Sequence, residues 1–141
     1  MAIPSVGGGY QVGDGNINEM QLGTQSTPTA LTTSATLTAA QLATKLLTAN
    51  QAGGATATYT LPTGTSMDAY FTNAKVDSSF DFCLTNISAV AAEDVTIAAG
   101  TGFTVVGNMT VASNAAATDQ SAGTFRARRT AANTWVLYRI S

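Results

Sequence analysis

Short runs of alternating apolar and polar residues, separated by glycine, proline or asparagine turns, dominate the chain from residue 55 to its end. Alternation with a period of two predicts half-buried β-strands, and it occurs in the runs 55–61, 80–86, 94–98, 103–106 and 109–112. Turn signals at intervals of roughly 8–12 residues are typical of all-β sandwiches and barrels. We therefore predict a mainly β fold, a β-sandwich or small barrel of about seven or eight short strands.

The chain closes with a predicted β-hairpin, in which FRARR at 125–129 and WVLYRI at 135–140 are joined by a small polar turn. The returning arm is apolar on both faces, with Trp135 and Leu137 on one face and Tyr138 on the other. A strand of this kind is usually covered on both sides. We expect these three residues to pack in the core or against a neighbouring subunit of a trimer.

The first half of the chain contains one strong helix signal. Thr38 and Gln41 match a capping box, in which each side chain satisfies a backbone N–H of the other residue. Leu42 and the Leu46-Leu47 pair supply an apolar stripe behind it. The pattern predicts one short helix near residues 38–49.

Three further local elements are expected. A strand is predicted at 32–37, before the helix, and one helical turn capped by Ser66 is predicted at 65–71. The dipeptide Gly107-Asn108, between two alternating runs, predicts a tight hairpin.

Residues 1–26 differ in character from the rest of the chain. Glycines at 7–9 and in GDGN at 13–16 interrupt any regular element, yet the segment carries too many apolar side chains for an inert linker. We predict an extended N-terminal arm at 1–26, which orders against a partner or a neighbouring subunit, and a β domain at 27–141; a frayed terminus without a role is the alternative. The arm residues expected to make these contacts are Tyr10, Val12, Ile17, Met20 and Leu22.

The chain is unusually poor in charge. Asp, Glu, Lys and Arg make up 10% of the residues, against roughly 25% in an average soluble protein, and the net charge is −2. A subunit that hides much of its surface in an assembly needs less charge than a monomer, so the composition favours an oligomer. The absence of a basic stripe argues against nucleic-acid binding.

The charged residues are expected to have structural roles. Arg126 and Arg128 fall on one face of the hairpin and Arg129 on the other, so they do not form one basic groove. We expect them to pair with acids such as Asp81 or Glu93. The adjacent pair Glu93-Asp94 is expected to be a solvated strand start.

The sequence contains no catalytic constellation that we recognise. It has no histidine, which excludes histidine-based triads, and the single Cys83 permits no internal disulfide and is expected to be a buried or half-buried, inert thiol. We expect no metal site and no cofactor, no small-molecule substrate and no enzymatic activity. Neither a signal peptide nor a membrane-spanning run is apparent, so synthesis in a cytoplasm and no membrane partner are expected.

Four segments resemble small structural proteins of tailed bacteriophages: TYTLPTGTSMDA, SFDFCLTNIS, AAEDVTIAAGTGFTVVGNMTV and SAGTFRARRTAANTWVLYRIS. The likeness is strongest to capsid decoration (cement) proteins of environmental and cyanobacterial phages, and it covers residues 55–141. The resemblance implies a β-rich homotrimer that sits on the outer capsid surface at local threefold positions and bridges major capsid protein subunits after the shell expands. The arm then drapes across neighbouring capsid subunits.

Two other binding functions remain open. The strand-turn-Trp-strand pattern at the C-terminus also resembles phage tail-fibre tips, which are trimeric and bind host glycans or surface proteins. A monomeric β-sandwich binding module of a host cell is a third interpretation, which the low charge disfavours.

Overall fold

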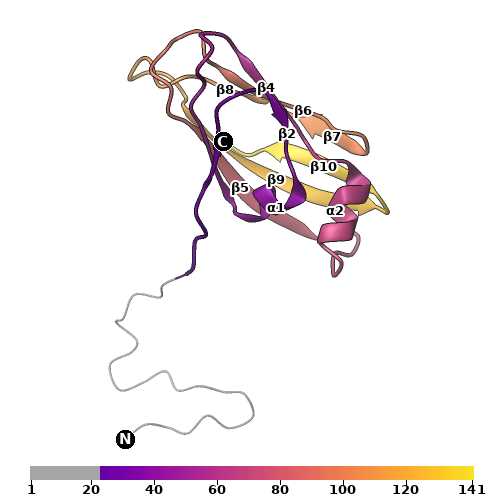
Figure 1. Cartoon of the computed structure of the whole chain (residues 1–141). Helices are drawn as coiled ribbons and strands as arrows, with labels where there is room; N and C mark the ends of the chain where they lie inside the picture. The colour runs from indigo at the N-terminus through magenta and orange to yellow at the C-terminus, as the bar shows by residue number, and fades with distance from the viewer. Residues whose placement is uncertain (1–22) are drawn as a thin grey trace, which may run out of the picture.

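The computed structural model describes residues 23–141, and in these residues ten strands and two short helices form a two-layer β-sandwich (Figure 1). The predicted mainly β fold is confirmed, with more strands than the sequence indicated. One layer is a six-stranded sheet of order β1-β3-β5-β9-β10-β7, and the other is a four-stranded sheet of order β2-β4-β6-β8. The elements are β1 (Thr29–Leu31), β2 (Ala35–Thr36), α1 (Ala39–Ala43), β3 (Leu46–Ala49), β4 (Ala57–Thr60), α2 (Gly64–Tyr70), β5 (Ser79–Asn86), β6 (Val95–Ala98), β7 (Phe103–Val106), β8 (Thr110–Val111), β9 (Ala122–Ala131) and β10 (Thr134–Arg139).

The chain alternates between the two layers from β1 to β8. Odd-numbered strands join the six-stranded sheet and even-numbered strands join the four-stranded sheet. As a result β1, β3 and β5 are parallel neighbours, and so are β2, β4 and β6. The β9–β10 hairpin then fills the gap between β5 and β7, pairing antiparallel with β5 and parallel with β7.

The core lies between the two sheets. Alternate residues of each strand point inward, so that Phe82 and Leu84 of β5 face Tyr59 and Ile97 of the opposite layer. Each large side chain that is fully buried in this way contributes about 1.5–3 kcal/mol. The largest of them are Trp135, Tyr59, Phe82, Phe125, Leu37, Leu42, Leu47, Leu61, Met67, Leu84, Ile97 and Leu137.

The predicted helix at 38–49 is wrong beyond its first turn. The capping box is present, with the Thr38 hydroxyl accepting from the Gln41 N–H and the Gln41 amide accepting from the Thr38 N–H. However, α1 ends at Ala43, and Lys45 adopts a left-handed conformation with φ of 63°. Leu46–Ala49 is instead β3, because pairing on both sides with β1 and β5 buries Leu47 completely.

Three other local predictions are corrected. The hairpin at Gly107-Asn108 is absent, since β7 pairs with β10 in one layer and β8 pairs with β6 in the other. Helix α2 is capped by Thr63 and not by Ser66, because the Thr63 hydroxyl accepts from the Ser66 N–H. Of the strand expected at 32–37, only Ala35–Thr36 is extended, as β2 of the four-stranded sheet, whereas β1 ends at Leu31 and belongs to the other sheet.

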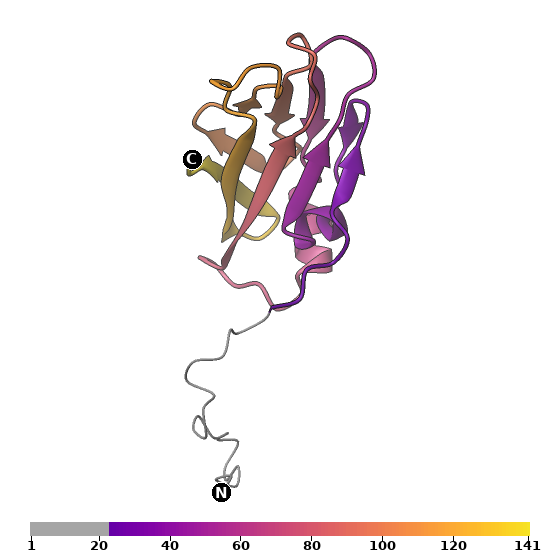
Figure 2. The same cartoon turned by 90° about the vertical axis from the view of Figure 1, so that its left-hand side faces the viewer.

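Both helices lie at one end of the sandwich, the end at which the described chain begins (Figure 2). Gln25 is held there by a hydrogen bond of 2.6 Å from its side-chain amide to the carbonyl of Thr44, the residue that follows α1. The turn of the β9–β10 hairpin reaches the same end and meets α2. No helix of the described residues is long and apolar enough to cross a membrane.

Candidate functional site

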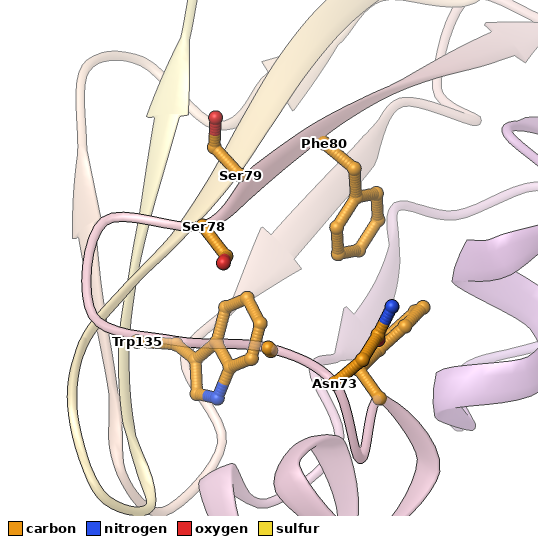
Figure 3. A pocket seen from close by; sticks show the side chains of 7 residues that line it. Asn73, Ser78, Ser79, Phe80 and Trp135 are labelled. Atoms are coloured by element: carbon orange, nitrogen blue, oxygen red, sulfur yellow. The ribbon is translucent and has the colours of Figure 1, made fainter.

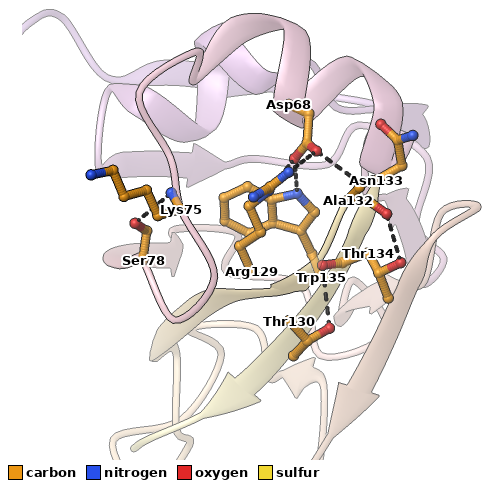
Figure 4. Close-up of polar contacts among 9 residues, drawn as sticks. All are labelled: Asp68, Lys75, Ser78, Arg129, Thr130, Ala132, Asn133, Thr134 and Trp135. Atoms are coloured by element: carbon orange, nitrogen blue, oxygen red, sulfur yellow. Dashed lines mark hydrogen bonds and ion pairs between the residues drawn. The ribbon is translucent and has the colours of Figure 1, made fainter.

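One carboxylate joins α2 to the C-terminal hairpin (Figure 4). Asp68 accepts hydrogen bonds from Arg129 Nε at 2.9 Å and Nη2 at 2.6 Å, and from the Trp135 indole N–H at 2.9 Å. The backbone N–H of Asn133, in the hairpin turn, donates a fourth hydrogen bond at 2.8 Å. The side chains of Asp68 and Arg129 are each only 17% exposed. The cluster therefore fixes the position of the helix relative to β9 and β10.

The hydrogen bonds from Arg129 hold the pKa of Asp68 well below its usual range, against the opposing effect of burial. The Asn133 and Trp135 N–H groups lower the pKa further. Asp68 is thus ionised at neutral pH with four donors around it. Such a carboxylate is suited to holding structure together and poorly suited to taking up a proton in catalysis.

The arginines of the hairpin pair with acids, as expected. Of the two acids named, Asp81 is such a partner and Glu93 is not. Arg126 pairs with Asp81, which confirms that pairing, and Arg128 pairs with Asp77. Arg129 binds Asp68, which sequence reasoning missed because the two residues are 61 positions apart.

The expectation that Glu93 is solvated or bound to an arginine is wrong. Glu93 is 3% exposed, and its carboxylate accepts from the backbone N–H of Gly54 at 2.7 Å and from the Ser88 hydroxyl. Its backbone carbonyl accepts from the Asn86 side chain at 2.8 Å. The carboxylate thus joins the 50–56 and 87–94 loops at the start of two neighbouring strands, a contact that no local pattern reveals.

An aromatic cleft of about 210 Å³ opens beside the Asp68 cluster (Figure 3). Phe71, Phe80 and Trp135 form its apolar wall, and their ring centroids lie between 4.9 and 6.3 Å apart. Asn73 and Ser78 add polar groups, and none of the lining residues within 23–141 has an ionisable side chain. Although Trp135 lines the cleft, its side chain is only 1% exposed, so the cleft gives a ligand almost no access to the indole.

A wider groove of about 430 Å³ lies on the helix side of the molecule, lined by both helices and their N-terminal caps. Its wall carries the hydroxyls of Thr38, Thr63 and Ser66, together with Pro62. At its edge stands Tyr70, whose side chain is among the most exposed of the large apolar ones in the described residues, at 51%.

The outer face of the six-stranded sheet combines ion pairs with apolar side chains. Arg126 binds Asp81 through two hydrogen bonds of 2.7 and 2.8 Å, and a hollow of about 430 Å³ lined by Lys45, Phe80 and this pair lies beside it. Tyr138 belongs to this outer face and lies opposite Val106 of the neighbouring strand.

The residues singled out in the sequence fall in different places. Trp135 and Leu137 are in the core of the single chain, at 1% and 0% exposure, whereas Tyr138 is half-buried on the outer face. The five arm residues expected to contact a capsid or subunit lie outside the described residues: Tyr10, Val12, Ile17, Met20 and Leu22.

Groups suited to catalysis are not gathered at any of these places. Cys83 is half-buried on the outer face, with its sulfur 3.9 Å from the Thr85 hydroxyl. Between residues 23 and 141, no three Cys, Asp or Glu side chains are grouped closely enough to hold a metal ion.

No protein-family model matches this sequence, and no curated protein or solved structure is significantly similar to it.

Proposed function

We propose that this chain is a capsid decoration protein of a tailed bacteriophage. It is made in the host cytoplasm, forms a homotrimer and binds the outer surface of the expanded shell, where it bridges major capsid protein subunits. The N-terminal arm, residues 1–26, reaches across neighbouring capsid subunits, and the β-sandwich is the domain that it tethers to the shell.

The observation that carries this proposal is that residues 23–141 form a β-sandwich with a hydrophobic core of their own. Among residues 23–141 the hydrophobic core extends from Leu31 to Leu137, and its side chains pack against one another between the two sheets. We expect the apolar residues of the N-terminal segment, from Tyr10 to Leu22, to contact another protein. The segment joins the domain at the helix end, where Gln25 is bonded to Thr44.

The make-up of the domain fits a structural role. Its arginines at 126, 128 and 129 are bound to acids of the same chain, and its buried side-chain polar atoms all have partners among the described residues. The resemblance of residues 55–141 to decoration proteins points in the same direction. A protein that binds only the assembled shell stabilises it by mass action, even when each interface is modest.

The test is a deletion of residues 1–22. We expect the truncated protein to keep the far-ultraviolet circular dichroism and thermal unfolding of the full chain, but to stop co-sedimenting with expanded shells. The shells are assembled from the major capsid protein encoded in the same phage genome. A matched full-length variant, Ile17→Ser with Leu22→Ser, is expected to bind more weakly. If the truncated protein binds shells as well as the full chain, the proposed role of the arm is wrong.

The groove beside Tyr70 supports a second candidate, a tail-fibre tip that binds host glycans. An exposed aromatic ring next to several hydroxyls can stack on a sugar and hydrogen-bond to it. On this hypothesis the full chain binds host cells, and Tyr70→Ala lowers that binding at least tenfold without changing thermal unfolding. A chain that binds shells and shows no binding to cells excludes it.

A further inference from the structure

An apolar strip runs along β10 and β7 on the outer face of the six-stranded sheet. Val136 and Tyr138 point outward from β10, opposite Thr104 and Val106 of β7. Ile140 follows the same alternation one residue beyond β10. Val106 and Ile140 are 47% and 51% exposed, which is high for large aliphatic side chains in a folded domain. We call Val106, Val136, Tyr138 and Ile140 the β10 strip.

Charged groups beside the strip are already neutralised within the face. Arg126 binds Asp81 through two parallel hydrogen bonds, and Arg128 binds Asp77. These pairs lie across β5, β9 and the loop before β5, next to β10 in the sheet. Close to the strip the face therefore combines apolar side chains with paired charges, whereas Lys45, which lies directly before β3 and beside the Arg126–Asp81 pair, is separated from β10 by β5 and β9.

This charge arrangement limits what the face can bind. A nucleic acid or an anionic lipid surface needs free basic groups, and the two arginines of this face are engaged. A strongly basic partner needs free acidic groups, and Asp77 and Asp81 are already paired with the two arginines. A second copy of the β10 strip brings apolar side chains and paired charges, so it places no unpaired like charge against the strip and leaves no ion pair broken.

We propose that copies of this chain contact one another through the β10 strip. In a trimer the strips of three copies meet around the threefold axis, so that the strip residues of one copy lie against those of its neighbours; two copies packed face to face would form a twofold pair instead. Trp135 and Leu137, on the opposite face of the same strand, stay in the core of their own subunit. The strand is then covered on both sides, by its own core and by a neighbour. The number of subunits, three, is taken from the proposed function, whereas the contact through the strip is not.

The experiment measures the solution mass of the full chain by light scattering over a range of concentrations. We expect a mass near three times 14.3 kDa for the natural chain and near 14.3 kDa for Val106→Glu. Glutamate at this exposed edge position does not disturb the core, and circular dichroism of the variant checks that it is folded. Tyr138→Ser removes apolar area without adding charge. We expect the oligomer of this variant to dissociate already at higher protein concentrations than that of the natural chain.

The matched control is Thr58→Glu. Thr58 is an exposed, outward residue of β4 in the four-stranded sheet, so its substitution adds the same charge to the other face of the sandwich. We expect it to leave the mass unchanged. A natural chain that is monomeric at all concentrations, or a Val106→Glu variant that keeps the full mass, overturns the inference.

Shell binding, measured separately, distinguishes this inference from the proposed function. A monomeric chain that co-sediments with shells removes the strip contact and leaves the decoration role. A dimer that Val106→Glu dissociates supports the strip contact and contradicts the threefold arrangement.

Discussion

Asp68 in α2 binds Arg129 in β9 through two hydrogen bonds of 2.9 and 2.6 Å, although 61 residues separate them in the chain. The same carboxylate accepts the indole N–H of Trp135, so helix, hairpin and core tryptophan meet at one group. Phe71, directly after α2, packs 6.3 Å from Trp135 between ring centroids. The ion pair therefore also positions one wall of the aromatic cleft.

Replacing Asp68 with alanine should destabilise the domain. The change leaves the indole N–H of Trp135 and the backbone N–H of Asn133 without an acceptor in a largely covered site, and a buried unsatisfied donor costs about 1–3 kcal/mol. We expect the free energy of unfolding, measured with urea, to fall by about 2 kcal/mol. Asp81→Ala is the control: Asp81 is 42% exposed and binds only Arg126, so its loss is expected to have a much smaller effect. Equal effects of the two substitutions would contradict the structural role of Asp68.

Acid should remove the contribution of the Asp68 charge. Its folded-state pKa is depressed by Arg129 from an ordinary value near 3.8, so the ionised form stabilises the fold fully at pH values above that ordinary value. As the pH falls below about 4, the unfolded chain takes up a proton before the folded chain does, and this stabilisation is lost progressively.

The comparison that isolates this effect uses Asp68→Asn. We expect the difference in unfolding free energy between the natural chain and this variant to be constant above about pH 5 and to shrink below about pH 4. The pKa of Asp81 is also lowered, by Arg126, but Asp81 is present in both proteins and cancels in the difference. A difference that stays constant down to low pH would show that Asp68 is not held ionised by the fold.

Local patterns in the sequence predicted the local features of this fold. The capping box at Thr38 and Gln41, the inward face of β4 and the strand Phe80–Asn86 each depend on neighbouring residues, and each is present. The C-terminal hairpin is present as well, with Asn133 at φ of 56° in its turn.

Features set by distant contacts were not predictable in this way. Leu46-Leu47-Thr48-Ala49 continues a helical apolar stripe, but parallel pairing with β1 and β5 makes it a central strand. Glu93 looks like a surface residue until the loop at Gly54 is brought against it. The alternation of strands between two sheets likewise depends on pairings between residues far apart, which hairpin signals such as Gly107-Asn108 do not encode.

Glu93→Ala should destabilise the end of the sandwich opposite the helices (Figure 2). The substitution removes the acceptor for the Gly54 N–H and for the Ser88 hydroxyl inside a site that is 3% exposed. We expect a loss of about 3 kcal/mol in unfolding free energy, the upper end for an unsatisfied buried group.

Hydrogen exchange adds a local readout for the same variant. The Gly54 amide is expected to exchange faster in Glu93→Ala, while amides in the β9–β10 hairpin change only with global stability. The control is Asp119→Ala, which removes a comparable side-chain contact to the Ala116 N–H on an exposed loop and is expected to change stability by less than about 0.5 kcal/mol. Unchanged exchange at Gly54 would mean that the carboxylate does not hold the loop.

The close approach of α2 to the hairpin turn predicts the effect of a single methyl group. A Cβ at Gly64 would overlap the backbone carbonyl of Asn133, which cannot move without disturbing the turn and the nearby Gly102. We expect Gly64→Ala to lower the free energy of unfolding by about 3 kcal/mol, because overpacking against backbone forces the elements apart. Gly53→Ala is the matched substitution at a loop position where a Cβ meets no atom within 4 Å, and its effect should stay below about 0.5 kcal/mol. Urea unfolding of both variants measures the two values side by side. A Gly64→Ala protein as stable as Gly53→Ala would show that the helix does not lie against the Asn133 carbonyl. Asp68 would then have to hold α2 and the hairpin turn together in a different arrangement.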